Sequence, residues 1–255
     1  MTAILRISGV TVCFGGVTAV DDVSFDVAAG ELLGLIGPNG AGKTTIMRSI
    51  TGIVKPDRGK IELNGERLNG YPTHRRVRLG LAISQQLVRP FREMTLLDNV
   101  SFATGYKKTE GPMKAFFSVA RKSNRERARD LLELVGITAQ RELMASQVPL
   151  GVVKRMEVAR ALALDPKVLL LDEPLAGLNS KEAGKLADTV VTLNERSLTV
   201  VLIEHNLSEV MRVCSRLVVL DNGRKIGDGS PKIVMDDPLV RTAYLGAMEN
   251  QNATA

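Results

Sequence analysis

Residues 37–44 match the pattern G-x-x-x-x-G-K-[ST], in which a glycine-rich loop surrounds a phosphate group, and Thr45 follows directly. Glycine lets the backbone curl, so that successive N–H groups and the N-terminus of the following helix point at one anion. Lys43 adds a mobile positive charge over the terminal phosphates, and the Thr44 hydroxyl is a ligand for Mg²⁺. The segment predicts a nucleotide-binding loop, called the phosphate loop below, which consists of Gly37, Pro38, Asn39, Gly40, Ala41, Gly42, Lys43, Thr44 and Thr45.

The residues on either side supply the context that a phosphate loop requires. The apolar run 32–36 predicts a short buried strand, and residues 44–51 predict a helix that ends at Gly52. Strand, glycine loop and helix follow one another in the order that lets a helix N-terminus face a phosphate. This context disfavours the alternative, an ordinary glycine turn.

Two carboxylates follow a second apolar run. Asp172 and Glu173 stand at the end of residues 168–172, and ligands of open parallel sheets bind at the carboxyl ends of strands. One carboxylate can then reach a metal ion while the other reaches water. We expect Asp172 to act on Mg²⁺ through a bound water, and Glu173 to orient or deprotonate the attacking water. The alternative, two acidic residues that begin an ordinary loop, is weakened by the phosphate loop.

One of the two histidines takes a similar position. His205 follows the apolar run 199–204, which predicts a strand next to the one that carries Asp172. A lone histidine is usually a surface or core residue, but the end of a parallel strand favours a catalytic role. His74 lies in a basic helical segment, and we predict no function for it.

The pattern of the remaining chain predicts an α/β fold. Residues 4–14 and 19–27 alternate apolar and polar side chains around Gly15 and Gly16, which predicts an antiparallel hairpin, and a third short strand precedes the turn at Asn64 and Gly65. Continuous apolar strands that alternate with helices predict a parallel sheet buried on both faces. These strands are expected at 81–86, 168–172, 199–204 and 217–220, with helices at 180–193 and 152–164 and a helical segment from 96 to 164.

Composition limits the class of protein. The chain has 255 residues, of which 44% are hydrophobic and 24% charged, enough for one large or two small domains. No apolar run approaches the roughly 20 residues that cross a bilayer, and no signal peptide is recognised, so we expect a cytoplasmic protein. Cys13 and Cys214 match no metal or redox spacing. We expect both to be small core residues, without a disulfide.

The net charge of +6 comes from one segment. Residues 107–129 contain eight basic and two acidic side chains, a difference equal to the net charge of the whole chain. A long phosphate-binding groove would need basic residues in many places, so we expect no nucleic-acid partner. Two interpretations of the basic segment stay open: a surface that faces acidic lipid or a membrane protein, and a solvated helix face.

Together these motifs resemble the ATP-binding subunit of an ABC transporter, within the branch that imports branched-chain amino acids. The phosphate loop, Asp172 with Glu173, the segment 175–179 and His205 follow in the family's order and spacing. The branch resemblance rests on residues 88–95, on the basic insertion after residue 103, and on the tail 243–246.

The resemblance implies roles for two further residues. Phe14, one of nine aromatic residues, could pack in a core or stack on an adenine ring, and the sequence alone does not decide between them. The family's pattern implies stacking. For Gln86 it implies sensing of Mg²⁺ and of the transport subunit.

The resemblance also implies architecture and partners. It implies a mixed, mainly parallel core sheet with an antiparallel β subdomain, formed by residues 1–95 and 165–255, and an inserted helical subdomain at 96–164. The cofactors implied are ATP and Mg²⁺, and the protein would bind permease subunits at the cytoplasmic face of the inner membrane. The alternatives are an ATPase for lipopolysaccharide or lipid export, a soluble ABC ATPase, and a P-loop kinase.

One motif departs from the family. Its usual signature, Leu-Ser-Gly-Gly-Gln, is replaced at 148–152 by Val-Pro-Leu-Gly-Val. In the family this segment donates a serine hydroxyl and backbone amides to the γ-phosphate of a dimer partner, but Pro149 has neither hydroxyl nor N–H. Amides of Gly151 and Val152 are expected to stay available. We therefore expect a heterodimer with a second ATPase subunit, with a homodimer as the alternative.

Overall fold

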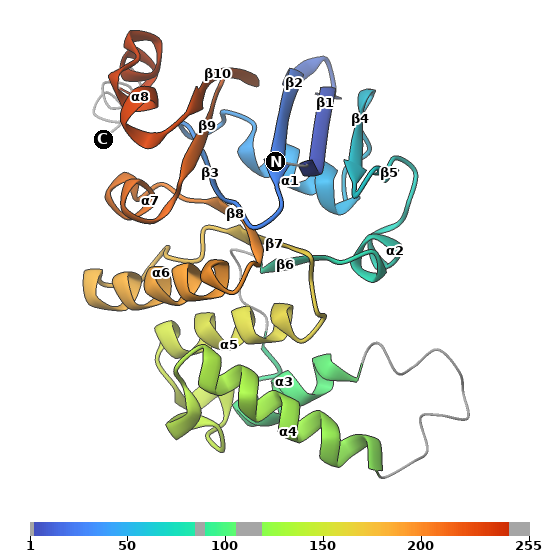
Figure 1. Ribbon diagram of the computed structural model, residues 1–255, viewed down its shortest axis with the longest axis vertical. Helices are drawn as coiled ribbons and strands as arrows, with labels where there is room; N and C mark the ends of the chain where they lie inside the picture. Colours follow the sequence, from blue (N-terminus) through green and yellow to red (C-terminus); the bar gives the residue numbers. More distant parts are fainter. Residues whose placement is uncertain (1–2, 85–89, 106–118, 245–255) are drawn as a thin grey trace.

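The computed structural model describes residues 3–84, 90–105 and 119–244, with the side chains of α4 described from residue 122 onward (Figure 1). The chain forms two sheets and a group of helices. In chain order the strands are β1 (Ala3–Phe14), β2 (Val17–Ala28), β3 (Leu32–Ile36), β4 (Arg58–Leu63), β5 (Glu66–Arg67), β6 (Leu81–Ser84), β7 (Val168–Asp172), β8 (Thr199–Ile203), β9 (Arg216–Asp221) and β10 (Arg224–Gly229). The α-helices are α1 (Lys43–Thr51), α2 (Thr73–Arg78), α3 (Leu96–Thr104), α4 (Val119–Leu134), α5 (Leu150–Leu162), α6 (Ser180–Glu195), α7 (Leu207–Val213) and α8 (Pro231–Asp236).

The smaller sheet is antiparallel, with strand order β2-β1-β4-β5. The predicted hairpin is confirmed, because β1 and β2 pair antiparallel across a turn at Gly15 and Gly16, both with positive φ. The predicted third strand is also confirmed, as β4. Alternation along these strands buries Leu5 and Ile7 on one face while Arg6 stays exposed.

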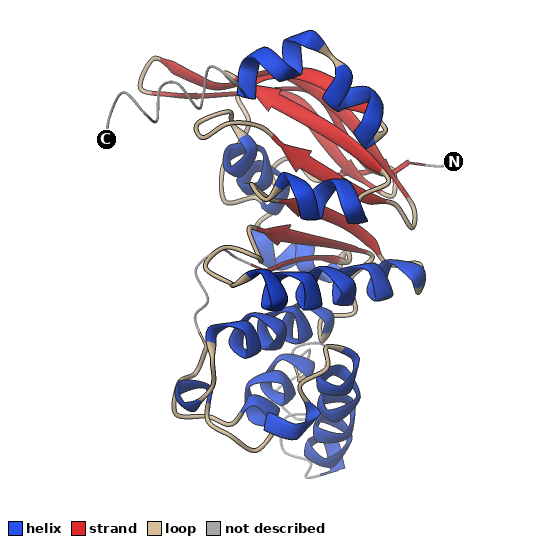
Figure 2. Ribbon diagram, turned by 90° about the vertical axis from the view of Figure 1, so that its left-hand side faces the viewer, coloured by secondary structure: helices blue, strands red, loops and turns tan. Residues whose placement is uncertain are grey.

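The larger sheet carries the continuous apolar strands. Its order is β10-β9-β3-β8-β7-β6, in which neighbouring strands from β9 to β6 are parallel and β10 is antiparallel to β9. Every residue of β3 and β8 is buried, as expected for strands covered on both faces. The predicted α/β class, with a mixed and mainly parallel core sheet, is confirmed. Figure 2 shows the helices on either side of the strands.

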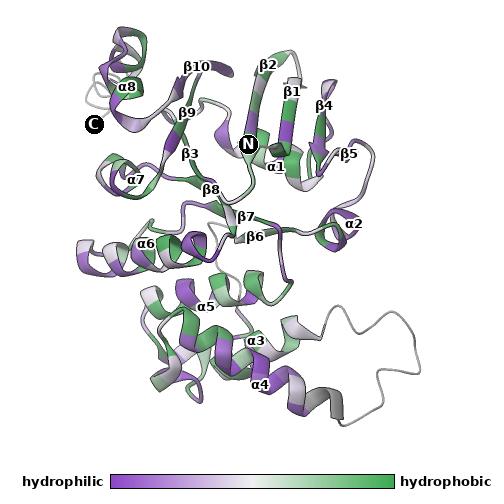
Figure 3. Cartoon of the chain, in the orientation of Figure 1, coloured by the Kyte–Doolittle hydropathy of each residue, from purple (hydrophilic) through white to green (hydrophobic). Residues whose placement is uncertain are grey.

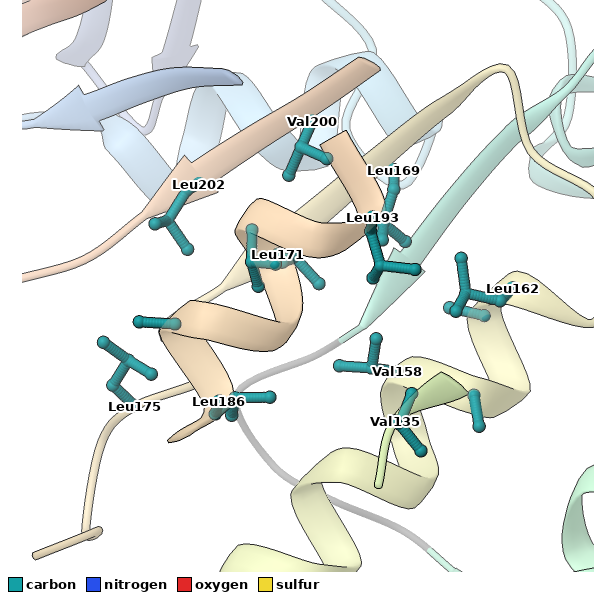
Figure 4. Packing of buried hydrophobic residues seen from close by; sticks show 14 of the residues in the cluster. Val135, Val158, Leu162, Leu169, Leu171, Leu175, Leu186, Leu193, Val200 and Leu202 are labelled. Carbon is teal, nitrogen blue, oxygen red and sulfur yellow. The ribbon is translucent and has the colours of Figure 1, made fainter. Parts of the chain in front are cut away.

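Alternate residues of each parallel strand enter two separate cores. Leu169 and Leu171 of β7 belong to the core shared with the helices, whereas Val168 and Leu170 belong to the core shared with α1 and the antiparallel sheet. Figure 4 shows the first of these cores, where the strand side chains face Leu186 of α6 and other leucines. Each apolar strand therefore joins two layers, which fixes its carboxyl end in place.

The helices α3, α4 and α5 lie together at one end of the molecule (Figure 1). The predicted apolar face of α4 is confirmed, because Ala128, Leu131 and Leu132 are buried with Val135, and polar residues cover the rest of the helix (Figure 3). The division into residues 1–95, 96–164 and 165–255 stays a prediction. No helix in the described parts of the chain is long and apolar enough to cross a membrane. Most of the basic insertion, 106–118, lies outside the described residues.

The prediction for the cysteines is half wrong. Both thiols are free, but only Cys214 is buried, and burial raises its pKa to about 12. Cys13 is exposed, because it stands among the last residues of β1, where the strand extends past the side chains that cover its centre. It is therefore not a core residue.

Candidate nucleotide site

The phosphate loop begins where the buried strand β3 ends. Gly37, Gly40 and Gly42 have φ values of 146°, 79° and 99°, which disfavour other residues. Space also requires glycine at two of them: a Cβ on Gly37 would lie 2.0 Å from the backbone oxygen of Leu220, and one on Gly42 would lie 2.6 Å from that of Ala19. The neighbouring strands therefore lie so close to the loop that only glycine fits at these two positions.

Lys43 is the first residue of α1 and is almost fully buried. Its Nζ donates hydrogen bonds of 2.8 Å to the backbone oxygens of Gly37 and Pro38. Burial lowers the pKa of Lys43, and the charges of Glu173 and Asp172 act in the opposite direction. No side chain caps the N-terminus of α1, so its first backbone N–H groups remain directed at the loop.

The structure brings Glu173 and His205 into contact. Glu173 follows β7, and its Oε1 lies 2.5 Å from Nε2 of His205, which stands two residues after the end of β8. Both side chains line the same cleft as the phosphate loop. The volume of this cleft is about 160 Å³, and its other lining residues are Ala19, Asn39, Gly40, Ala41, Gly42, Lys43, Thr44 and Thr45.

Asp172 has the properties of a carboxylate that lacks a cation. Its Oδ1 is buried and has no hydrogen-bond partner among the described residues. Burial raises the pKa of Asp172, the charge of Glu173 raises it further, and the charges of Arg48 and Lys43 oppose the shift. Within the described part of the chain no three acidic, histidine or cysteine side chains form a metal cluster. A cation here would take its other ligands from the Thr44 hydroxyl, water and phosphate, which suits Mg²⁺.

Two predicted site residues lie away from this cleft or outside the structure. Phe14 ends β1 and is 51% exposed, so the core-packing interpretation is wrong, and the side chain is free to stack on a ligand. It is not among the residues that line the cleft. Gln86 lies outside the described residues.

The segment at the signature position forms the start of α5. Pro149 takes the N-cap position without a side-chain cap, and Leu150 is 46% exposed. The expectation for the amides is wrong at Val152, whose N–H donates to the oxygen of Pro149 at 3.0 Å. The reason is general: the oxygen of an N-cap residue accepts the first hydrogen bonds of the helix.

The sequence analysis missed two buried charged residues beside Glu173. Glu204 directly precedes His205, and its Oε1 accepts a 2.6 Å hydrogen bond from the N–H of Leu175. Burial raises its pKa to about 7, although hydrogen bonds and the charge of Lys154 oppose this. Lys154 of α5 donates from Nζ to the backbone oxygen of Glu173 at 3.2 Å. Glu204 could have been predicted, as His205 was, from its position at the end of a parallel strand. No sequence pattern indicates Lys154.

The tail identified in the sequence also reaches the site. Tyr244 packs against the core shared with the helices, and burial raises the pKa of its hydroxyl to about 12. A hydrogen bond with the backbone of Gly37 opposes that shift. The C-terminal part of the chain therefore contacts the first residue of the phosphate loop.

Comparison with known proteins agrees with this geometry. Residues 20–176 match the family described as "ABC transporter". The chain is 39% identical over 249 residues to the high-affinity branched-chain amino acid transport ATP-binding protein BraF of Pseudomonas aeruginosa, covering 95% of this chain and 98% of that protein. It is 37% identical over 227 residues to the lipopolysaccharide export system ATP-binding protein LptB of Acidithiobacillus ferridurans, covering 89% and 90%.

A solved structure leads to the same family. The crystal structure of the ADP conformation of MJ1267, an ATP-binding cassette of an ABC transporter, matches with a TM-score of 0.85 and 30% identity. The match covers 96% of this chain and all of that one. The fold and the sequence therefore agree over nearly the whole length, and the chain belongs to the ABC transporter family as an ATP-binding and ATP-hydrolysing subunit.

Proposed function

We propose that this subunit drives the import of branched-chain amino acids or related small solutes through a membrane permease. The proposal is supported by BraF and LivG, the branched-chain amino acid transport ATP-binding proteins of Pseudomonas aeruginosa and Escherichia coli, which are 39% and 36% identical over 249 residues. Lipopolysaccharide export is the second candidate, because LptB is similar over a somewhat shorter stretch. We place the protein at the cytoplasmic face of the inner membrane, bound to the permease.

The observation that carries the catalytic proposal is the contact between Glu173 and His205 in the cleft of the phosphate loop. The loop N–H groups and Lys43 bind the phosphates of ATP. The Glu173 carboxylate then orients a water molecule toward the γ-phosphate and accepts its proton as the new P–O bond forms. The bond between the γ-phosphorus and the bridging oxygen breaks, and ADP leaves with that oxygen. His205 holds this carboxylate through the same contact within the cleft.

The residues present also fit Mg²⁺. Thr44 would hold the ion through its hydroxyl. Asp172, whose buried Oδ1 has no hydrogen-bond partner in the described part of the chain, would hold it directly or through water. Gln86, outside the described residues, is proposed as a further ligand. When bound, the ion neutralises negative charge on the transferred phosphate.

We further propose that the subunit works in a dimer with a different ATPase subunit. Each ATP site of such a dimer uses the phosphate loop of one chain and the signature segment of the other. This chain offers Pro149 and Leu150 where a hydroxyl and a close backbone amide are expected, and the Val152 N–H is already bonded. The site that this segment completes would therefore be the slower of two unequal sites.

The test is uptake by reconstituted vesicles. The chain is combined with the permease and ATPase subunits encoded beside it, and uptake of labelled leucine is followed with ATP inside. The expected result is leucine uptake that Glu173→Gln abolishes, with ADP and free phosphate as the products of ATP cleavage. Normal leucine uptake in cells that lack the chain, together with impaired lipopolysaccharide transport, would favour export instead. Phosphate transfer to another substrate would identify a kinase.

A further inference from the structure

A buried lysine links the helices to the backbone of Glu173. Lys154 belongs to α5, three residues after Gly151, and is only 5% exposed. Lysine is rarely buried to this extent without a partner. Its Nζ donates to the backbone oxygen of Glu173 at 3.2 Å, and burial lowers its pKa while the charges of Glu204 and Glu173 oppose the shift. The ammonium group therefore lies between α5 and the end of β7.

Glu204 holds the same region from the sheet. The residue is 3% exposed, and its two carboxylate oxygens accept N–H groups from two different loops. Oε1 accepts from Leu175 at 2.6 Å, and Oε2 accepts from His205 at 3.2 Å. Leu175 stands two residues after Glu173. The carboxylate of Glu204 therefore holds both of the loops that carry Glu173 and His205.

The backbone of Glu173 needs such support. Its φ is +50°, a left-handed conformation that is unfavourable for a residue other than glycine. Hydrogen bonds from three directions hold its backbone. Its N–H donates to the oxygen of Ile203 at 2.9 Å, and its oxygen accepts from the N–H of Ala176 at 3.3 Å and from Lys154 at 3.2 Å. Without the lysine, the bond that ties this backbone to α5 is lost at the residue that must face the attacking water.

We propose that Lys154 and Glu204 are positioning residues, which hold Glu173 against His205 and tie this pair to α5. The inference rests on the proposed role of Glu173. It also connects α5 to the catalytic site of its own chain, because Lys154, on the helix that begins at the altered signature segment, donates to the backbone oxygen of Glu173. A displacement of α5 would then move the backbone of Glu173.

The test compares Lys154→Met with Lys154→Arg, which retains the positive charge and the N–H donors. Lys185→Met, on the exposed face of α6, is the matched control. Each variant is first checked for folding by circular dichroism and for ATP affinity by fluorescence titration. Turnover is measured as phosphate release, and the imidazole of His205 is observed by NMR in the absence of nucleotide. The chain has only two histidines, so His74→Gln assigns the signals.

We expect Lys154→Met to lower kcat by roughly 10- to 100-fold with KM within about twofold of the wild type, since small displacements of a catalytic group have effects of this size. The His205 signals should shift in the direction seen for Glu173→Gln. Lys154→Arg should recover most of the turnover, and Lys185→Met should match the wild type. If Lys154→Met does not fold, Glu204→Gln tests the same claim and should give the same kcat loss and His205 shift.

Two outcomes distinguish a failure of the positioning role from a failure of the proposed function of Glu173. Wild-type turnover and wild-type His205 signals in Lys154→Met, with Glu173→Gln inactive, would overturn the positioning role alone. Full turnover in Glu173→Gln would overturn the proposed function of Glu173, and with it this inference, whatever the lysine variants show.

Discussion

Two regions of this chain stand where the ABC transporter family contacts phosphate, and they differ in how many of the phosphate-binding groups they retain. The phosphate loop curls through three glycines with positive φ, and Glu173, His205 and Lys43 line the same cleft. The start of α5 instead has Pro149 at its N-cap and an exposed Leu150. We propose that the first region binds the nucleotide of its own site and that the second is presented to a partner's site.

The difference shows that the two regions are under separate constraints. The glycines of the phosphate loop are fixed by the backbone of Leu220 and Ala19, so substitution there would disturb the core sheet itself. Pro149 and Leu150 stand at the exposed end of a helix, where a side chain can change without cost to the fold. Loss of the contacts that the signature segment would donate to a partner therefore leaves the chain's own nucleotide site intact.

The largest expected effect belongs to Glu173. Glu173→Gln should retain ATP affinity and lose turnover by roughly 10²- to 10⁴-fold, because a carboxamide keeps the shape of the side chain but cannot accept the proton. ATP should then hold the dimer closed, which size-exclusion chromatography detects. Glu195→Gln, exposed at the end of α6, is the control. Equal phosphate release by Glu173→Gln and the wild type would remove Glu173 from the mechanism and end the contrast between the two regions.

The second effect concerns Glu204, which lies between the regions. Its pKa in the folded chain is raised from 4.5 to about 7, so the folded state favours the protonated form. The stability that this proton provides is fully present below pH 4.5 and is lost as the pH rises to about 7. Glu204→Gln avoids this loss. Its free energy of unfolding, relative to the wild type, should therefore increase by on the order of 3 kcal/mol across that interval.

Urea unfolding at several pH values measures this change for Glu204→Gln. Lys154 and Glu173 carry the other charges that act on Glu204, so the same titration is repeated in Lys154→Met. Loss of the ammonium group should steepen the decline in stability, because the opposing positive charge is gone. A stability difference between Glu204→Gln and the wild type that does not change with pH would contradict the raised pKa.

Restoring the signature segment should raise turnover, a smaller change than that of Glu173→Gln and in the opposite direction. Pro149→Ser with Leu150→Gly supplies a hydroxyl and removes the exposed side chain. A hydrogen bond to a charged group typically contributes about 1.5–3 kcal/mol, which is roughly one to two orders of magnitude in rate if it acts in the transition state. Phosphate release by the purified chain should rise by that factor. The same double substitution combined with Glu173→Gln should stay inactive. Fast phosphate release by the wild type that the double substitution does not change would contradict the proposal of unequal sites.

The smallest effect is expected at Phe14. Aromatic stacking contributes about 0.5–1.5 kcal/mol, so Phe14→Ala should weaken ATP binding by about two- to tenfold, whereas Phe14→Tyr should not. Phe102→Ala is the matched control, because this phenylalanine is similarly exposed but lies on α3. Fluorescence titration with ATP measures the affinities. An affinity unchanged in Phe14→Ala would leave the exposed ring without a role at the nucleotide.

The sequence predicted the strands and the central part of the site because both follow from local rules. Continuous apolar runs identify β7 and β8, and a parallel sheet brings the residues after them to one edge, so Glu173 and His205 were expected together. The contact between Lys154 and Glu173 depends instead on how α5 packs against the sheet, which no periodicity describes. The short strand β10 was missed for a related reason, since its single apolar residue, Ile226, makes no recognisable pattern.

The position of β3 also affects how the chain folds during synthesis. This strand hydrogen-bonds to β8 on one side and to β9 on the other, and it has no sheet neighbour until residues 199–221 have been made. The antiparallel β1–β2 hairpin needs only its own 26 residues, Ala3–Phe14 and Val17–Ala28 with their turn. Long-range pairing of parallel strands forms slowly. The phosphate loop therefore leaves the ribosome early but acquires its binding shape only near the end of translation, when Tyr244 can also reach Gly37.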